Sequence, residues 1–404
     1  MKIINHIKSS FIGIPHKIWV LSVVSFINRS GAMVICFLTL YLTEKLHFSL
    51  TNAGYMMSMY GLGAIVGAYF GGQWTDRFGY QKVQLLTLIG NGLMLFVLML
   101  QRDFWNIGIA LFVLNVISEA FRPANSVSIR ANSDEGNRTR SYSLLRVMVN
   151  LAITFALSLG GLLISYGWEF IFWADAITCF GAAAFIYFYI PQNENHIPTK
   201  TDIKEAKSSN LSPYRDISFL AFTFLTFLSA MAFMQILWTV PPFFKQIYHW
   251  DETKIGFVCA INGFVVMLVE LPLISSIDGK RSNLWMVRFG LFLYAISYLA
   301  FVLPFSYALL PAVLYMIFIS FGEIFAMPFG TTWVTKNSPE AAQGKYLGLY
   351  IMAYSMSNVF APLMGTQIIE NFGFTTLWYV ISAMSLLTLL GFFYLEKRYE
   401  KEKI

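Results

Sequence analysis

The chain has 404 residues, of which 57% are hydrophobic and 12% are charged, and its mean hydropathy is +0.60. Soluble domains carry about 25% charged residues, so this composition excludes a soluble globular protein and indicates a polytopic membrane protein. The formal net charge of +6 reflects where basic residues lie around membrane spans and does not indicate nucleic-acid binding.

Apolar runs of about 20 residues, the length that crosses a bilayer, recur along the whole chain. They predict an all-α membrane protein with twelve transmembrane helices. In chain order we expect helices at residues 17–43, 51–73, 82–101, 105–130, 140–165, 169–190, 216–246, 253–275, 284–303, 307–333, 344–369 and 374–395. The first follows a basic start and is expected to act as the insertion signal, without a cleavable signal peptide.

A polar stretch rich in Pro, Ser, Lys and Glu separates the sixth and seventh predicted helices. We interpret residues 191–213 as a solvated cytoplasmic linker. It divides the chain into an N-terminal six-helix bundle, residues 1–190, and a C-terminal six-helix bundle, residues 214–404.

The two halves carry an internal repeat. Each copy has a Glu inside an apolar helix, then a Pro, a polar loop, a long apolar helix and an aromatic-Gly-aromatic step. Glu119 and Glu323 are 204 residues apart, Gly167 and Gly373 are 206 apart, and half the chain is 202 residues. The halves are therefore predicted to be pseudo-symmetric. Parallel repeats of this kind are typical of secondary transporters, which bind substrate between the copies near mid-membrane.

The basic residues predict the orientation. Of the 28 lysines and arginines, 21 fall in the termini and in the loops on one side, four fall on the other side, and three lie inside spans. Because cytoplasmic loops carry the excess of Lys and Arg, both termini are expected in the cytoplasm of a multi-pass protein of the cell (inner) membrane.

Charged side chains inside spans are the candidate functional residues, because each costs about 2.5–3.5 kcal/mol at the bilayer centre and is retained where it faces a cavity or a partner. The predicted substrate- and proton-binding cavity contains Arg29, Glu119, Arg122, Asn150, Asp175 and Glu323. Arg146 and Glu270 are predicted to belong to a cytoplasmic gate.

Glu119 and Glu323 stand at matching places in the two repeats, about halfway along their helices. A buried carboxylate is a candidate proton carrier. Glu119 has Arg122 one turn away, which leaves two interpretations open: a structural ion pair or a coupling residue. Glu323 has no basic residue within a helical turn of sequence, so we predict that it is the main proton-coupling carboxylate, against the alternative of a locally satisfied structural Glu.

The remaining charges also have two interpretations each. Arg29, Arg122 and Arg146 make the N-terminal half electropositive, which suits an anionic or zwitterionic substrate group or a helix-packing ion network. Asp175 is equally consistent with the cavity and with a helix–helix hydrogen bond. Glu270 fits a gate pair or a binding residue.

The segment after the second span reads Gly-Gly-Gln-Trp-Thr-Asp-Arg-Phe-Gly-Tyr-Gln-Lys over residues 71–82. It resembles the signature loop of the major facilitator superfamily, G-x-L-A-D-R-x-G-R-K. Gly72, Asp76, Arg77 and Gly79 match this pattern directly, and Lys82 stands one place after the last basic position. A weaker second copy of the loop in the C-terminal half keeps Asp278. The resemblance covers the whole chain and implies that these residues form a cytoplasmic gate.

Segments of the first, fourth and fifth helices resemble the bacterial drug:proton antiporter-type branch of that superfamily. The fifth helix departs from the exporter pattern, with Ala152 and Ala156 in place of two glycines. The first helix carries Arg29 where proton-coupled peptide symporters have the Arg of E-x-x-E-R, but Asn28 replaces the second Glu.

We therefore predict a proton-coupled secondary transporter that moves a small amphiphilic organic molecule by alternating access, in the direction of efflux. The alternative is a symporter that imports a peptide-like or anionic nutrient. An enzyme or a channel is disfavoured, since no nucleophile motif, P-loop or metal-ligand spacing is present. No cofactor, metal, disulfide or nucleic-acid partner is expected; the partners are the substrate, protons and the bilayer, and the chain is expected to act as a monomer.

Overall fold

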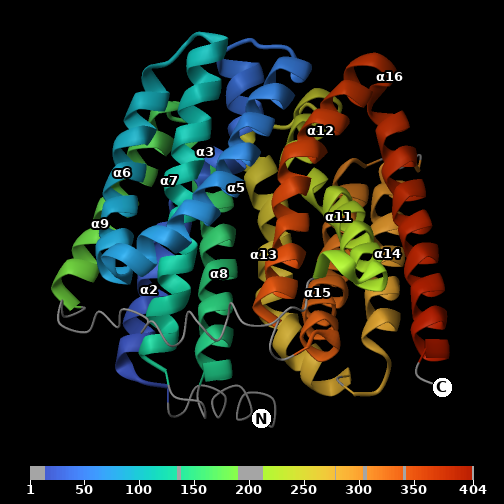
Figure 1. The fold of residues 1–404 in the computed structure, drawn as a ribbon. Helices are drawn as coiled ribbons and strands as arrows, with labels where there is room; N and C mark the ends of the chain where they lie inside the picture. The colour runs from blue at the N-terminus through green and yellow to red at the C-terminus, as the bar shows by residue number, and fades with distance from the viewer. Residues whose placement is uncertain are drawn as a thin grey trace, which may run out of the picture. The chain divides into compact units, whose positions relative to one another are not determined.

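The computed structural model describes residues 14–133, 138–189, 213–277, 279–303, 307–339 and 343–402. Within these ranges the chain is helical and contains no β-strand (Figure 1). The predicted linker lies almost wholly outside them. So does Asp278, the acid of the second copy of the signature loop.

The described helices account for the twelve predicted spans. The first span consists of α2 (His16–Ser30), α3 (Met33–Cys36), α4 (Leu38–Leu40) and the π-helix η1 (Tyr41–Lys45). The next five are α5 (Leu50–Phe78), α6 (Tyr80–Leu100), α7 (Phe104–Ala131), α8 (Arg138–Ile164) and α9 (Glu169–Tyr189). The second half has a 3₁₀ turn, η3 (Pro213–Arg215), and then α11 (Ile217–Trp238), α12 (Val240–Gln246), α13 (Glu252–Ile277), α14 (Asn283–Leu299), α15 (Leu309–Asn337) and α16 (Gln343–Glu402).

Eight helical segments of the described residues are long and apolar enough to cross a membrane, with α11 and α12 together forming one of them. One of them, α16, contains the eleventh and twelfth spans, which meet at Gly373 with φ +82°. Because a positive φ favours glycine, this residue turns the chain between two spans without a loop. The all-helical, twelve-span architecture is confirmed.

Two of the predicted spans are not continuous helices. The helix expected at 17–43 breaks at Gly31 and Ala32. The helix expected at 216–246 breaks at Thr239, and α12 restarts with prolines in its first turn, Pro241 and Pro242. Proline has no backbone N–H, so it fits the first turn of a new helix and interrupts the ladder of the old one.

The segment expected as a loop after the second span is mostly helical. Helix α5 continues to Phe78, and Tyr80 already begins α6, so a single residue, Gly79 with φ +84°, separates the two helices. The hydrophobic run ends near residue 73, but the helix does not need apolar residues once it leaves the bilayer core. Hydropathy therefore placed its end too early.

The chain forms two compact units whose limits differ from those of the repeats. Unit 1 comprises the described parts of 1–48, 59–197 and 251–267, and unit 2 those of 49–58, 198–250 and 268–404. In unit 1, α6 packs on α7 and α9, and α2 packs on α8 and α9. In unit 2, α11 packs on α16, and α14 packs on α15 and α16. Helices α5 and α13 each contribute to both units.

Glycines bring α5 and α7 into backbone contact inside unit 1. A Cβ on Gly63 would lie 2.4 Å from the Phe112 oxygen, one on Gly67 2.4 Å from the Val116 oxygen, and one on Gly71 2.5 Å from the Ala120 Cα. Both helices advance by four residues between successive contacts, so one stripe on each helix meets the other. Small residues at such spacing let transmembrane helices approach closely.

Close backbone contact at glycines also joins α13 to α8 inside unit 1. A Cβ on Gly256 would lie 2.3 Å from the Leu157 oxygen, and one on Gly161 would lie 2.4 Å from the Glu252 oxygen. The hydroxyl of Thr253 donates to the Gly161 carbonyl at 3.1 Å. The N-terminal part of α13 is therefore attached to a helix of the first repeat.

We expect Gly67→Leu to destabilise the protein by at least ~1–3 kcal/mol, the usual cost of overpacking, because the Val116 backbone cannot move aside within its helix. Thermal unfolding of the purified protein in detergent measures the effect. Gly72→Ala is the control, because a Cβ there meets nothing within 4 Å. Equal unfolding midpoints for the two variants would contradict the close packing of α5 on α7.

Candidate functional site

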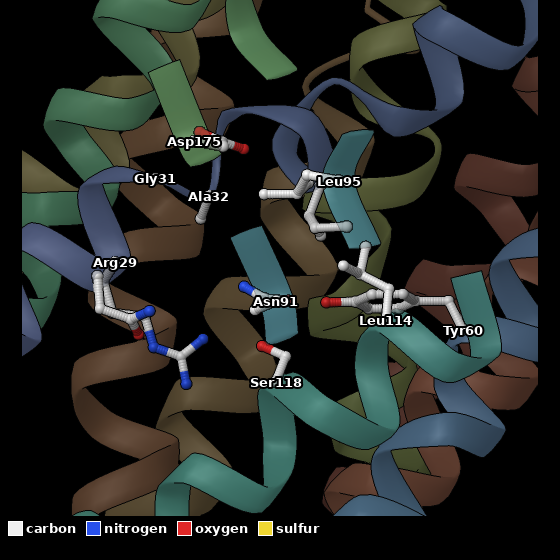
Figure 2. Close-up of a pocket in the computed structure, with 11 residues that line it drawn as sticks. Arg29, Gly31, Ala32, Tyr60, Asn91, Leu95, Leu114, Ser118 and Asp175 are labelled. Atoms are coloured by element: carbon white, nitrogen blue, oxygen red, sulfur yellow. The ribbon is translucent and has the colours of Figure 1, made fainter. Parts of the chain in front are cut away.

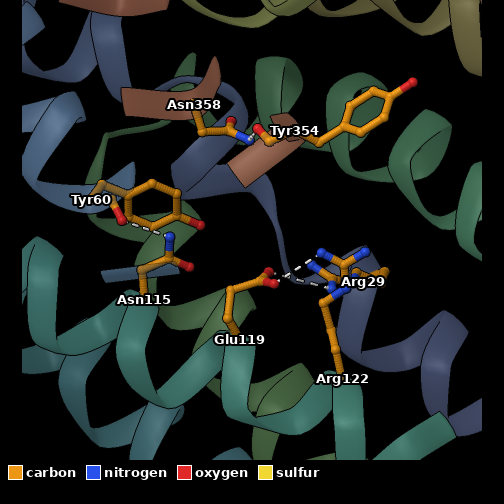
Figure 3. Close-up of polar contacts among 7 residues, drawn as sticks. All are labelled: Arg29, Tyr60, Asn115, Glu119, Arg122, Tyr354 and Asn358. Carbon is orange, nitrogen blue, oxygen red and sulfur yellow. Dashed lines mark hydrogen bonds and ion pairs between the residues drawn. The ribbon is translucent and has the colours of Figure 1, made fainter. Parts of the chain in front are cut away.

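A carboxylate held by two arginines forms the charged centre of unit 1. Glu119, in the middle of α7, receives a 2.9 Å contact from Arg122 Nη1, and Arg29 Nη2 of α2 lies 3.9 Å from its other oxygen (Figure 3). The Glu119 side chain is 15% exposed, that of Arg29 30% and that of Arg122 59%. The predicted pairing of Glu119 with Arg122 is present, and Arg29 joins it.

The triad carries one net positive charge. Its two guanidinium groups leave N–H donors that Glu119 does not occupy, since each guanidinium has five. Such donors suit a carboxylate or phosphate group, which arginine binds in a bidentate manner. Arg122 is the most exposed of the three side chains.

A cavity lies beside the triad within unit 1. Its wall includes Arg29, Tyr60, Asn91, Ser118 and Asp175, which come from five elements of the first repeat (Figure 2). The wall is therefore amphiphilic: these polar groups alternate with apolar neighbours such as Leu95 and Leu114. Of the predicted cavity residues, the structure brings Arg29 and Asp175 to this wall.

Asp175 of α9 holds the break in the first span. Its Oδ1 accepts the Met33 N–H at 3.1 Å and its Oδ2 accepts the Val34 N–H at 2.8 Å, and its side chain is 1% exposed. Gly31 fits against the same helix, because a Cβ on Gly31 would lie 1.9 Å from Thr178 Oγ1. Asp175 therefore lines this cavity and makes hydrogen bonds between α9 and α3.

Sequence reasoning missed three polar residues of this region, Tyr60, Asn91 and Asn115. Asn91 donates to Cys179 Sγ at 3.4 Å, and its Oδ1 is buried without a hydrogen bond in the described structure. Asn115 donates to the Tyr60 carbonyl at 2.8 Å. The two asparagines could have been found from the sequence, because each places an amide inside an otherwise apolar helix. An amide in a bilayer is costly unless it has a hydrogen-bond partner.

In unit 2, Glu323 lies half-buried on α15 among tyrosines. It interacts electrostatically with Tyr294 of α14 and Tyr354 of α16. The Tyr354 hydroxyl lies 3.3 Å from that of Tyr350, which also accepts a hydrogen bond from Thr331 Oγ1 at 3.3 Å. Asn358 donates to the Tyr354 carbonyl at 3.1 Å (Figure 3). Glu323 thus interacts with tyrosines of two neighbouring helices, and Glu119 pairs with two arginines.

The two repeats differ in charge at equivalent positions. Arg122 corresponds to Ala326 or Met327 of the second repeat, and Asp175, with the offset of 206, corresponds to the buried Ile381. The fold therefore forms in the second repeat without these charges, so it does not itself require them. Their presence in the first repeat is consistent with a function of unit 1.

The other predicted residues lie away from the cavity wall. On α8, Asn150 is half-buried, and its carbonyl accepts Thr154 Oγ1 at 2.9 Å and faces Gly263 of α13. Arg146 is half-buried one turn before it, and Glu270 is 5% exposed on α13. Asp76, Arg77 and Lys82 are exposed at the α5–α6 junction, where the Arg77 guanidinium stacks 5.2 Å from the Phe78 ring.

Comparison with known proteins identifies the family. The model of the Major Facilitator Superfamily matches residues 18–326 and 222–404. The chain belongs to this superfamily. It is therefore a membrane transporter and not an enzyme.

Individual relatives are distant. A Na⁺, Li⁺, K⁺/H⁺ antiporter of Planococcus maritimus is 23% identical, covering 92% of both chains. A class H tetracycline resistance protein of Pasteurella multocida is 23% identical, covering 78% of both. Among solved structures, a POT family transporter in complex with a thioalcohol-conjugated peptide superposes with TM-score 0.81 over 96% of this chain and 97% of its own, at 14% identity, which shows a shared fold.

We expect Glu119→Gln to lower the unfolding temperature more than Arg122→Gln. The first change leaves two cations without their counter-charge, one of them 30% exposed, whereas the second removes a 59%-exposed partner and leaves the contact of Glu119 with Arg29. Thermal unfolding of both variants at low and at high salt measures the difference. A larger effect of Arg122→Gln would show that Glu119 is not the centre of the triad.

Proposed function

We propose that this transporter exports a small amphiphilic organic molecule in exchange for protons, by alternating access across the cell (inner) membrane. The observation that carries the proposal is the contrast between two repeat-equivalent acids: Glu119 is fixed by two arginines, and Glu323 lies among tyrosines. We infer that Glu323, and not Glu119 with its two arginine partners, exchanges a proton during each cycle.

The composition of the cavity wall in unit 1 supports an amphiphilic substrate. The cavity of unit 1 combines apolar side chains with the hydroxyl, amide and charged groups of a few residues. Sites of this composition take amphiphilic ligands: the apolar part buries surface, and the polar groups fix orientation. A tetracycline resistance protein among the relatives supports an organic substrate and the outward direction. We take the monomer as the working unit.

Import of an anionic or peptide-like nutrient is the second candidate. It is favoured by the net positive triad of Arg29, Glu119 and Arg122, whose free guanidinium donors match a substrate carboxylate. On this alternative, substrate and proton move in the same direction.

Proteoliposomes with an imposed pH gradient distinguish the two candidates. We expect a tetracycline or a lipophilic dye to accumulate in vesicles that are acidic inside, because outflow of protons drives inflow of the exchanged substrate. Accumulation of a dipeptide in vesicles that are acidic outside would establish the symport candidate instead. Movement of Na⁺ or K⁺ alone, with no organic compound transported, would overturn both.

We expect Glu323→Gln to abolish gradient-driven accumulation but to retain counterflow exchange. The amide keeps the shape of the site and cannot release a proton, so coupling is lost while substrate movement remains. The measurement is pH-gradient-driven transport against counterflow in the same vesicles.

Glu370→Gln is the matched control, since Glu370 is exposed and accepts the Thr51 N–H at 2.8 Å, a bond that an amide oxygen also accepts. Retained accumulation in Glu323→Gln would show that another carboxylate carries the proton.

We further propose that both termini and the segment 191–213 are cytoplasmic. A cysteine at Ser208 is then expected to resist an impermeant thiol reagent added outside intact cells, whereas a cysteine at Asn106, exposed in the first turn of α7, is expected to react. The native cysteines give little background, because Cys36, Cys179 and Cys259 are buried. Labelling of Ser208→Cys with protection of Asn106→Cys would reverse the orientation.

A further inference from the structure

We propose that Asp175 is a proton-binding site that controls the break in the first span. Protonation of Asp175 would loosen the hold of α9 on α3, and deprotonation would restore it. This assigns the cavity of unit 1 a proton site separate from Glu323. Only the consequence for transport rests on the proposed proton coupling; binding of the proton to Asp175 stands apart from it.

The first step of the argument is the environment of the carboxylate. Asp175 is 1% exposed on a membrane-spanning helix, and among the described residues no Lys or Arg forms an ion pair with it. A charge in such a place is costly unless it is neutralised. The two backbone N–H groups of Met33 and Val34 stabilise the carboxylate but carry no net charge. A proton is the smallest species that neutralises it.

The second step is access. Asp175 lines the same cavity as Arg29, with Asn91, Ser118 and Tyr60 on the wall (Figure 2). Hydroxyl and amide groups can hold water, and water can bring a proton to the carboxylate. A merely structural hydrogen-bond acceptor does not need a cavity beside it.

The third step is what protonation changes. A carboxylate accepts both N–H groups in charge-assisted hydrogen bonds, which are roughly twice as strong as neutral ones. A carboxylic acid has one carbonyl oxygen and one hydroxyl, so one of the two bonds loses most of its strength. Met33 and Val34 begin α3, and Arg29 lies four residues before Met33 at the end of α2. The break therefore connects the state of Asp175 to the residue that pairs with Glu119.

Other groups near Asp175 must be separated from it in any test. Those that interact with it or line the same cavity are Arg29 of α2, Cys36 of α3, Tyr60 of α5 and Cys179 of α9, and Glu119 of α7 pairs with Arg29. Arginine does not titrate in the physiological range, and buried thiols and phenols titrate only at alkaline pH. Glu119 is therefore the group whose contribution the experiment has to exclude.

Cys36 supplies a native reporter, because it lies in α3 two residues after Val34 and is 7% exposed. With Cys179→Ser and Cys259→Ser, the rate of Cys36 alkylation by N-ethylmaleimide is measured between about pH 6 and about pH 8.5 without substrate or gradient. Each rate is divided by that of the unfolded protein at the same pH, which removes the intrinsic chemistry of the thiol.

We expect the normalised rate to rise roughly fivefold or more towards acid pH, since the weaker bonds let α3 open. Asp175→Asn is expected to react fast at every pH, because its amide accepts only one of the two N–H groups. Two controls are expected to keep this rise in rate towards acid pH, called the pH step below. They are Thr178→Val, which alters the same turn of α9 but keeps the carboxylate, and Glu119→Gln.

Asp175→Glu keeps a carboxylate and is also expected to retain a pH step. Size-exclusion profiles show whether each variant is folded.

A pH step of equal size in Asp175→Asn, or its loss in Glu119→Gln, would overturn the assignment. A pH-independent rate in the otherwise unchanged protein would also overturn it. None of these outcomes bears on gradient-driven export, which Glu323→Gln tests in proteoliposomes. If export fails but the alkylation rate of Cys36 still depends on pH through Asp175, the proposed function is overturned and the assignment of a proton site to Asp175 stands.

Discussion

Backbone N–H and C=O groups inside a bilayer have no water to bind, so every interruption of a spanning helix needs a partner supplied by the protein. The first span is interrupted at Gly31 and Ala32, and the side chain of Asp175, more than 140 residues away in sequence, accepts the freed N–H groups. The position of Arg29, and with it the triad around Glu119, depends on where this break lies. The charged centre of unit 1 is therefore built on one hydrogen-bonded contact between α9 and α3.

The second constraint is the absence of a hydrophobic driving force between helices that are surrounded by lipid. Close backbone approach replaces it, and glycine is the residue that permits it. The stripe of Gly63, Gly67 and Gly71 fixes α5 against α7, and Gly256 fixes α13 against α8. Parts of α5 and of α13 each belong to the unit formed mainly by the other repeat.

The repeats share architecture and differ in chemistry. Glu119 and Glu323 are equivalent in sequence, yet one pairs with arginines and the other interacts with tyrosines. Divergence of the neighbouring side chains has therefore given two repeat-equivalent acids different partners, and the proposed coupling assigns the proton to Glu323.

The sequence by itself determined the spans, the repeat, the superfamily and which acids lie inside spans, because hydropathy and charge within a helix are local properties. The pairing of Glu119 with Arg122 was visible for the same reason: the two residues are one turn apart. Only the tertiary structure decided that Arg29 joins them, that Asp175 holds Met33 and Val34, and that Asn91 lies on the cavity wall. The broken first span was missed because Gly31 and Ala32 are compatible with a continuous apolar helix, and their break is stabilised by a residue that only the packing of α9 brings near.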